Sequence, residues 1–454
     1  MKRLELKPTE ENIVKTIEKD IFNRNNELRC FYNLLISQED GCTIAIDGKW
    51  GSGKTFFIKQ EIMLINAMNP MNQDERQNLD IIKNKIMKKE EQKYDEIRMN
   101  MKPVYYDAWQ NDNDIDPIVS LICEISKQTK EFVQTKKLDL IKAGTAIVDY
   151  FMKTNISDIY NSNKGDNYFE YLIYRKDLED DFKDFFNNLC NENCNRIVIF
   201  IDELDRCKPS YAVKLLEQVK HYMDDDRITF VFALNTLELQ HTIRQFYGYG
   251  FDANRYLDRF FDIRASLTTV DINKYYIELG ELDDDIIDIV GKIIINEYDL
   301  GLREITRYLG QLKLIKSSLS KNTFFYDGKV KQIISVIIAP LMIGLHMINI
   351  DTYNSFINGE NIEPLLRVYN AAPEDFYWLI NSMLNKDESV ENVEGKKKVT
   401  QETIIKRLYE AIFGNLYNKD IDKIHLGQYI FRRSSKEYAL KISGLLNDEI
   451  KYDE

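Results

Sequence analysis

The sequence has no surplus of positive charge. Its 454 residues include 61 Lys and Arg against 74 Asp and Glu, which gives a formal net charge of −13. Binding along a nucleic-acid backbone needs clustered cations in excess, because much of the affinity comes from neutralising phosphates. The composition therefore argues against a broad nucleic-acid-binding surface and leaves room only for a local basic groove.

Cysteine and histidine are both scarce and scattered. The cysteines are Cys30, Cys42, Cys123, Cys190, Cys194 and Cys207, and the histidines are His221, His241, His346 and His425. Cys190 and Cys194 lie one helical turn apart, yet no second pair of cysteines and no nearby histidine completes a set of zinc ligands. We therefore expect no zinc site, and we expect free thiols in a reducing cytosol.

Apolar runs long enough to cross a bilayer, about 20 residues, are also missing. Charged residues interrupt residues 140–152, and the most apolar run, residues 333–348, contains Pro340 and falls short of that length. We interpret residues 333–348 as a buried core helix, with membrane contact as the alternative, and we expect no transmembrane segment. Residues 1–10 are charged and hold no apolar signal-peptide core, which predicts a cytosolic protein.

What the sequence does contain is a glycine-rich turn between a strand and a helix. The apolar residues 43–46 precede it, and a helix is expected from Lys54 through residue 65. The turn reads G-x-x-x-x-G-K-T and consists of Gly48, Lys49, Trp50, Gly51, Ser52, Gly53, Lys54 and Thr55. This is the pattern and the context of a phosphate-binding P-loop, the Walker A motif.

The chemistry of a P-loop explains these residue types. Glycines let successive backbone N–H groups point at phosphate oxygens, and the helix N-terminus adds free donors and a partial positive charge. Lys54 would reach the β- and γ-phosphates, and the Thr55 hydroxyl would hold Mg²⁺. The predicted nucleotide contacts are Gly48, Trp50, Gly51, Ser52, Gly53, Lys54, Thr55 and Phe56.

Further strands alternate with helices. Strands are expected at residues 103–107, 196–201 and 228–234, and helices at 117–133, 177–189 and 209–222. Continuous apolar runs such as 196–201 are typical of strands buried on both faces, which favours an α/β domain with a parallel sheet. Ligands of such sheets sit at the carboxyl ends of the strands, so Thr55, Asp202, Glu203 and Asn235 should meet in one cleft.

The strand pattern fades beyond Phe260, and residues 272–454 read as mainly helical. We therefore predict an α/β P-loop domain over residues 1–271, with helical insertions at about 66–102 and 134–190, and a helical C-terminal region over 272–454. The charged stretch 74–100 is interpreted as a solvated helical face, with a contact to a partner or nucleic acid as the alternative.

The strand that ends in Asp202-Glu203 supplies what NTP hydrolysis needs beside a P-loop, a Walker B motif. Asp202 would hold Mg²⁺ through its hydration shell, and Glu203 would orient and deprotonate the attacking water. Asn235 would hydrogen-bond the γ-phosphate or its water. For each of these residues the alternative is an ordinary cap or turn.

Together these stretches resemble the KAP family of P-loop NTPases, relatives of the AAA+ and STAND ATPases, over most of residues 10 to 320. The resemblance rests on residues 47–55 with Trp50 inside the loop, 106–109 (Tyr-Asp-Ala-Trp), 201–209, 212–213, 216–217, 232–235, 256–261 and 302–307. It implies ATP as the nucleotide, a strand between the P-loop strand and the Asp-Glu strand, and a helical C-terminal part.

Two departures from the family pattern matter. Many members carry paired transmembrane helices between the P-loop and the acidic strand, whereas this chain has charged helical material there, which puts membrane association in doubt. The family often has Asp-Asp where this chain has Asp202-Glu203, and the longer carboxylate supports hydrolysis. Members often serve in bacterial defence against phage or in plasmid exclusion, and the resemblance implies such a role.

An arginine is needed to complete such a site, since a cationic finger contributes on the order of 10³–10⁵ in rate. Arg259 is the first candidate, Arg255 the second, and Arg303 resembles a sensor arginine; a structural salt bridge is the alternative for each. We predict Mg²⁺-dependent ATP hydrolysis coupled to conformational change or self-association. The rival hypotheses are a non-hydrolysing ATP-gated scaffold and a nucleic-acid motor, and the acidic charge disfavours the motor.

Overall fold

The computed structural model describes residues 6–69, 76–87, 100–129, 144–149, 180–190, 194–222, 225–268, 270, 274–275, 285–321, 328–372, 401–414, 416–417, 421–427 and 429–444. The chain divides into two compact units, Lys7–Tyr275 and Tyr276–Glu454 together with Met1–Leu6. The domain limits expected from the sequence, 1–271 and 272–454, stay a prediction. The expected insertions at about 66–102 and 134–190 lie partly outside the described residues.

The first unit contains a parallel sheet of five strands. These are β1 (Thr43–Asp47), β2 (Met101–Asp107), β3 (Arg196–Asp202), β4 (Ile228–Leu234) and β5 (Ile263–Ser266), in the order β2-β3-β4-β1-β5. The predicted α/β class with a parallel sheet is thereby confirmed. The strand expected between the P-loop strand β1 and the Asp-Glu strand β3 is β4.

One further strand, β5, follows Phe260, at the point where the strand pattern of the sequence fades. This strand is an edge strand that pairs only with β1 among the described strands. Its four residues alternate between partly buried and exposed positions. Strand β5 is short and only partly apolar. It therefore lacks the continuous apolar run that is typical of β3 and β4.

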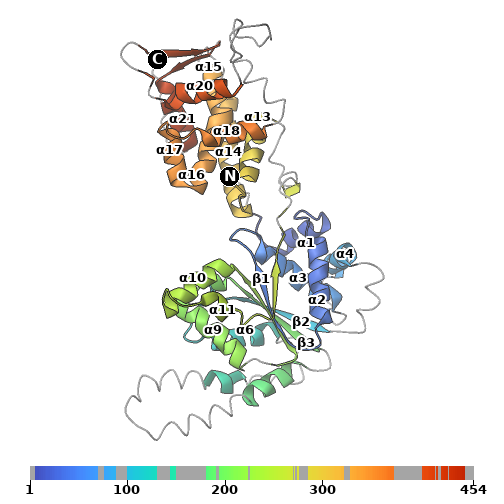
Figure 1. Cartoon of the computed structure of the whole chain (residues 1–454). Helices are drawn as coiled ribbons and strands as arrows, with labels where there is room; N and C mark the ends of the chain where they lie inside the picture. Colours follow the sequence, from blue (N-terminus) through green and yellow to red (C-terminus); the bar gives the residue numbers. More distant parts are fainter. Residues whose placement is uncertain are drawn as a thin grey trace, which may run out of the picture. The chain divides into compact units, whose positions relative to one another are not determined.

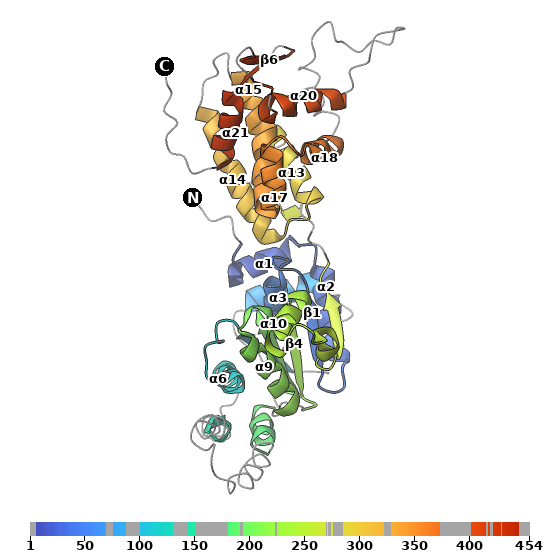
Figure 2. The same cartoon turned by 60° about the vertical axis from the view of Figure 1, so that its left-hand side comes forward.

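Two layers of helices cover the sheet. Figures 1 and 2 show α1 (Glu10–Glu18), α2 (Asn25–Ser37), α3 (Lys54–Met68) and α4 (Arg76–Ile86) on one face, and α6 (Pro117–Thr129), α9 (Pro209–Tyr222), α10 (Thr236–Tyr247) and α11 (Ala253–Leu257) on the other. Side chains of a strand alternate between these layers: Val198 and Phe200 join the α1–α4 core, whereas Ile199 and Ile201 join the opposite core. Strands β3 and β4 are therefore buried on both faces.

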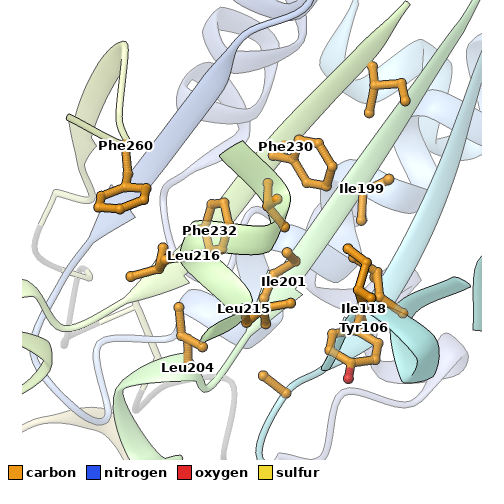
Figure 3. Close-up of a cluster of buried hydrophobic side chains, with 14 of the residues drawn as sticks. Tyr106, Ile118, Ile199, Ile201, Leu204, Leu215, Leu216, Phe230, Phe232 and Phe260 are labelled. Carbon is orange, nitrogen blue, oxygen red and sulfur yellow. The ribbon is translucent and has the colours of Figure 1, made fainter. Parts of the chain in front are cut away.

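The core beneath α9 is the more aromatic of the two layers. Figure 3 shows Phe230 and Phe232 of β4 beside Ile199 and Ile201 of β3, with Leu216 of α9 in the same cluster near Phe232. Fully burying each of these side chains contributes about 1.5–3 kcal/mol. The site described below therefore stands on strands that are fixed from both sides.

Glu61, on the buried face of α3, departs from its apolar surroundings. It is fully buried, and neither carboxylate oxygen has a hydrogen-bond partner among the described residues. Burial raises the pKa of Glu61 well above its ordinary value of 4.5. The folded protein therefore holds this proton at pH values where the unfolded chain has lost it.

This burial predicts a pH-dependent stability. The stabilisation from the proton on Glu61 is fully present below pH 4.5 and is lost as the pH rises through the raised pKa of the folded state. Glu61→Gln mimics the protonated form, so we expect a higher free energy of unfolding at neutral pH, by about 1–3 kcal/mol, and a weaker pH dependence. Urea unfolding at several pH values measures both, with the exposed Glu11→Gln as control. An unchanged pH dependence would contradict the assignment.

The second unit is mainly helical, as expected. It contains α13 (Ile286–Glu297), α14 (Leu302–Lys321), α15 (Gly328–Ile333), a π-helical turn η2 (Ile334–Ile338), α16 (Ala339–Ile348), α17 (Ile350–Ile357), α18 (Glu363–Ala371), α20 (Gln401–Phe413) and α21 (Ser434–Gly444). Pro340, near the start of α16, has no N–H to offer the preceding turn, which accounts for the wider turn before it.

One helical stretch of the described residues, Val330–Ile348, is long and apolar enough to cross a membrane by length and composition alone. In the structure, however, 72% of its 18-residue apolar window is buried. Tyr308 of α14 donates its hydroxyl to the carbonyl oxygen of Pro340 at 3.0 Å, and the hydroxyls of Ser335 and Tyr438 lie 3.0 Å apart. These contacts favour the predicted core helix over a membrane contact.

The C-terminal region also contains a β-hairpin that the sequence did not indicate. Strands β6 (Lys423–Leu426) and β7 (Tyr429–Arg432) pair in antiparallel fashion around Gly427, whose φ is 55°. Each strand has only four residues, so its alternation of apolar and polar side chains is too short to be distinguished from the helical pattern of the neighbouring segments.

Candidate functional site

The carboxyl ends of the strands coincide at one edge of the sheet. Asp107 of β2 pairs in register with Asp202 of β3, Asp202 pairs with Ala233 of β4, and Leu234 of β4 pairs with Asp47 of β1. The loop that follows β1 therefore emerges beside the acidic end of β3 with only β4 between them. This is the edge at which parallel sheets bind ligands.

The loop from Gly48 to Gly53 forms a compact cradle before α3. Gly51 and Gly53 have φ of 80° and 88°, the left-handed region that glycine tolerates without strain. A Cβ atom on Gly48 would lie 2.7 Å from Oγ of Ser52, so a larger residue there would fill the cradle. The buried Oγ of Ser52 has no hydrogen-bond partner among the described residues, which leaves it available to a phosphate oxygen.

Lys54 lies beneath this loop. Its Nζ donates hydrogen bonds to the carbonyl oxygens of Gly48 and Lys49, and only 9% of the residue is exposed. Burial lowers the pKa of Lys54, whereas the carboxylates of Asp205 and Asp202 act in the opposite direction. A cation held among loop carbonyls and carboxylates is placed to compensate the charge of an anionic ligand.

Asp202 ends β3 and is 1% exposed. Tyr105 donates its hydroxyl to Oδ2 at 3.2 Å, and the backbone N–H of Glu203 donates to Oδ1 at 2.9 Å. The hydroxyl of Thr55 is also near enough to stabilise the charged carboxylate. Burial raises the pKa of Asp202, and these hydrogen bonds oppose the rise. The first residues of α3 and the end of β3 thus meet directly.

Glu203 follows in an unusual conformation. Its φ is 59°, which places a non-glycine residue in the left-handed region just before the 3₁₀ turn η1 (Leu204–Arg206). Burial, followed by the neighbouring charge of Asp202, raises the pKa of Glu203 to about 7. Its side chain is 18% exposed and forms an ion pair with Nε of Arg206.

Two tryptophans border this acidic turn. The indole N–H of Trp50, inside the P-loop, donates to Oδ2 of Asp205 at 2.6 Å. The guanidinium carbon of Arg206 lies 5.7 Å from the centre of the Trp50 ring and 5.5 Å from that of Trp109. The P-loop, the end of β2 and the acidic turn are therefore joined through side chains.

A family model described as the KAP family P-loop domain matches residues 24–319. The match covers more than half of the chain and includes the loop, the acidic turn and all five parallel strands. The chain belongs to the KAP family of P-loop NTPases. No curated protein matches it.

A Mg²⁺ ion fits the residues of this KAP site. No group of three or more His, Cys, Asp or Glu side chains with suitable geometry occurs in the described part of the chain. A P-loop site does not need one, because Mg²⁺ in NTPases takes one or two protein oxygens, phosphate oxygens and water. The neighbouring side chains of Thr55 and Asp202 are suitable protein ligands, which keeps the predicted pair as a proposal.

The other residues predicted for the KAP site, Asn235 and the candidate arginines, have fewer contacts with it. Asn235 caps α10, because its Oδ1 accepts a hydrogen bond from the N–H of Glu238 at 3.4 Å. Arg255 and Arg259, on α11 and in the turn after it, are exposed, and Arg303 is exposed on α14 of the helical unit. Among the described residues no hydrogen bond or ion pair links Arg259 to Asp202 or Glu203. Their proposed roles toward phosphate remain predictions.

Two arginines near the KAP loop were not predicted to act there. Arg24 is 3% exposed and donates to the carbonyl oxygens of Ser52, at 3.0 Å, and of Thr268. Arg206 pairs with Glu203, and its spacing of three residues was a usable signal, because such residues meet in a helical turn. Nothing in the sequence around Arg24 indicated its contact with a loop 28 residues away.

Proposed function

We propose that this KAP-family chain binds ATP in the P-loop and hydrolyses it with Mg²⁺. The observation that carries the proposal is the meeting of three groups at one sheet edge: the cradle with Lys54, the Thr55–Asp202 pair, and the adjacent carboxylate of Glu203. Phosphate binding needs only the first group. The second and third are the groups that hydrolysis adds.

Each residue has a defined task in this proposal. The loop N–H groups and Lys54 bind the β- and γ-phosphates, and Thr55 and Asp202 hold Mg²⁺, which neutralises charge on the phosphate oxygens when bound. Glu203 accepts a proton from the attacking water while the water oxygen forms a bond to the γ-phosphorus. The bond between the γ-phosphorus and the bridging oxygen then breaks, and ADP and phosphate leave.

Metal removal should stop the reaction. We expect excess EDTA to abolish phosphate release and Thr55→Ala to lower it about 10²-fold or more, because Thr55 and Asp202 are the proposed protein ligands. A colorimetric phosphate assay with titrated Mg²⁺ measures both. Turnover that persists in EDTA would contradict the proposed role of the metal. Thr242→Ala, a hydroxyl on α10 that bonds the carbonyl of Glu238, is the matched control.

The contacts of Arg24 and its neighbours support a coupling between nucleotide state and the end of the α/β unit. Arg24 bonds both Ser52 of the P-loop and Thr268, just after β5. Phe22 stacks on Tyr275 with ring centres 5.8 Å apart, and it forms a T-shaped pair with Phe56 of α3 whose ring centres lie 5.3 Å apart. A shift of the loop on binding phosphate would thus reach the segment that leads out of the sheet.

Self-association is part of the proposal, because a finger arginine contributes on the order of 10³–10⁵ in rate. Arg259 is exposed and is therefore accessible to a second copy. We expect the mass of the chain in solution to rise on adding Mg²⁺ and ATP, and to stay constant for Lys54→Ala. Light scattering coupled to size exclusion measures this, and a wild-type mass that ATP leaves unchanged would contradict assembly.

The biological setting proposed for this activity is bacterial defence against phage or plasmid exclusion, as the family resemblance implies. The proposed location is the cytosol, because residues 1–10 are charged and hold no signal-peptide core. A second candidate function is an ATP-gated scaffold that binds the nucleotide without turning it over. The ion pair between Glu203 and Arg206 is the observation that favours it, since a carboxylate occupied by a guanidinium is a weaker base. Phosphate release separates the two candidates.

A further inference from the structure

Arg206 occupies a position between two aromatic rings and one carboxylate. Its guanidinium carbon lies 5.7 Å from the ring centre of Trp50 and 5.5 Å from that of Trp109. Its Nε forms an ion pair with Oε2 of Glu203. We call these three side chains, Trp50, Arg206 and Trp109, the Trp–Arg–Trp cluster. The guanidinium thus has two aromatic neighbours in addition to the carboxylate of Glu203.

Stability alone does not account for this cluster. As whole residues Trp50 and Trp109 remain 48% and 52% exposed, and the side chain of Arg206 is 21% exposed. Cation–π contacts and ion pairs that are open to water contribute little to stability. The left-handed backbone of Glu203, with φ of 59°, is by contrast unfavourable for a non-glycine residue. Strain of this kind, held by surrounding contacts, is typical of functional sites.

The geometry fixes the direction of the Glu203 carboxylate. The ion pair joins residues three apart across the turn η1, so one carboxylate oxygen is held against Arg206. Charge-assisted pairs to a guanidinium have a defined orientation, unlike pairs to an ammonium. With Oε2 engaged, Oε1 is the oxygen left to accept a proton.

The cluster also connects the orientation of the Glu203 carboxylate to the P-loop. Trp50 belongs to the loop, and its indole N–H donates to Asp205 at 2.6 Å, one residue before Arg206. Trp109 follows β2, which pairs with β3 up to Asp107 and Asp202. The base is thus positioned relative to both the phosphate-binding loop and the neighbouring strand.

We propose that Arg206, held by the ring faces of Trp50 and Trp109, is the positioning residue that aims the carboxylate of Glu203 at the water that attacks ATP. The inference rests on the proposed ATPase function and assigns control of the rate to a residue that lies outside the P-loop and contacts the proposed base. The cluster links the state of the P-loop to the orientation of the base.

The test compares Arg206→Gln, Arg206→Lys and the wild type. We expect Arg206→Gln to lower kcat about 10–100-fold, since misplacement of a reacting group by about 1 Å costs up to 10²-fold, while KM stays within about twofold. Arg206→Lys should restore part of kcat, because an ammonium still pairs with Glu203 but does not stack in a fixed plane. The equilibrium affinity for a non-hydrolysable ATP analogue should equal that of wild type in all variants.

Arg227→Gln is the matched control, because it removes an arginine that pairs with Asp225 at 2.6 Å before β4, at the opposite edge of the sheet. It should leave both kcat and KM unchanged. Thermal unfolding checks that each variant folds. If Arg206→Gln does not fold, Trp109→Leu carries the test, since this exposed ring supports the guanidinium and its loss should lower kcat with unchanged affinity.

Three outcomes overturn the inference. The first is a kcat of Arg206→Gln within twofold of wild type, or above it, and the second is a fall in analogue affinity parallel to the fall in kcat. The third is a wild type without any turnover, which also removes the proposed function. An active wild type with an equally active Arg206→Gln variant, by contrast, removes only the positioning role.

Discussion

Glu203→Gln is expected to lower steady-state phosphate release about 10²–10⁴-fold, the contribution that a positioned general base makes. Glutamine keeps the size of the side chain but cannot accept the proton of the attacking water. Because Glu203 contacts Arg206 rather than the P-loop cradle, the affinity for ATP should stay within a few-fold of wild type. Phosphate release and calorimetric binding of an ATP analogue measure the two quantities.

The control for Glu203→Gln is Glu402→Gln, the same chemical change at an exposed pair with Lys406 on α20. It should leave phosphate release unchanged. Steady release from Glu203→Gln at the wild-type rate would show that another group deprotonates the water, and the assignment of Glu203 would be wrong.

Lys54→Ala should abolish binding at working nucleotide concentrations. Each charge-assisted hydrogen bond contributes about 1.5–3 kcal/mol, and Lys54 is proposed to contact two phosphates, so a loss of affinity of about 10²-fold or more is expected. The buried ammonium now bonds the loop carbonyls of Gly48 and Lys49, so the substitution also removes a contact that shapes the cradle. Isothermal titration with Mg²⁺ and ATP measures the change.

Lys406→Ala, which removes an equally charged but exposed side chain from the helical unit, is the control for Lys54→Ala. A Lys54→Ala variant that binds ATP as tightly as wild type would place the nucleotide elsewhere. Circular dichroism of both variants separates a loss of binding from a loss of fold.

Long, strongly patterned elements were predictable from the sequence. The continuous apolar runs of β3 and β4 are buried at every residue, as such runs in parallel sheets must be. The sequence also predicted a glycine-rich turn between β1 and α3, and in the structure Gly51 and Gly53 adopt left-handed conformations there. The parallel sheet and the family are confirmed, whereas the roles of individual site residues stay predictions.

Short elements and contacts between distant segments were not predictable. Strands β5, β6 and β7 have four residues each, too few for a periodic pattern to rise above the background. The contact of Trp109 with Arg206 joins segments 97 residues apart and depends on the pairing of β2 with β3. Such a contact follows from strand order, which the local pattern does not encode.

Asn235 shows that a residue able to hydrogen-bond phosphate can instead serve as a helix cap. The sequence Asn235-x-x-Glu238 is a helix-capping pattern, and the side chain of Asn235 does accept the N–H of Glu238. Arg24 shows the reverse, since no motif surrounds it and yet its buried guanidinium bonds the P-loop and Thr268. A local sequence pattern is enough to identify a helix cap such as Asn235. The contacts of Arg24 with distant segments are visible only in the folded structure.

The measurement that tests the central claim most directly is steady-state phosphate release from Mg²⁺ and ATP across a wide range of protein concentration, with Lys54→Ala as the blank. An ATPase with the proposed site releases phosphate faster than Lys54→Ala, and its rate per chain rises with concentration if a second copy supplies the finger arginine. Tight ATP binding with release no faster than that of Lys54→Ala at every concentration would contradict the account and establish the scaffold.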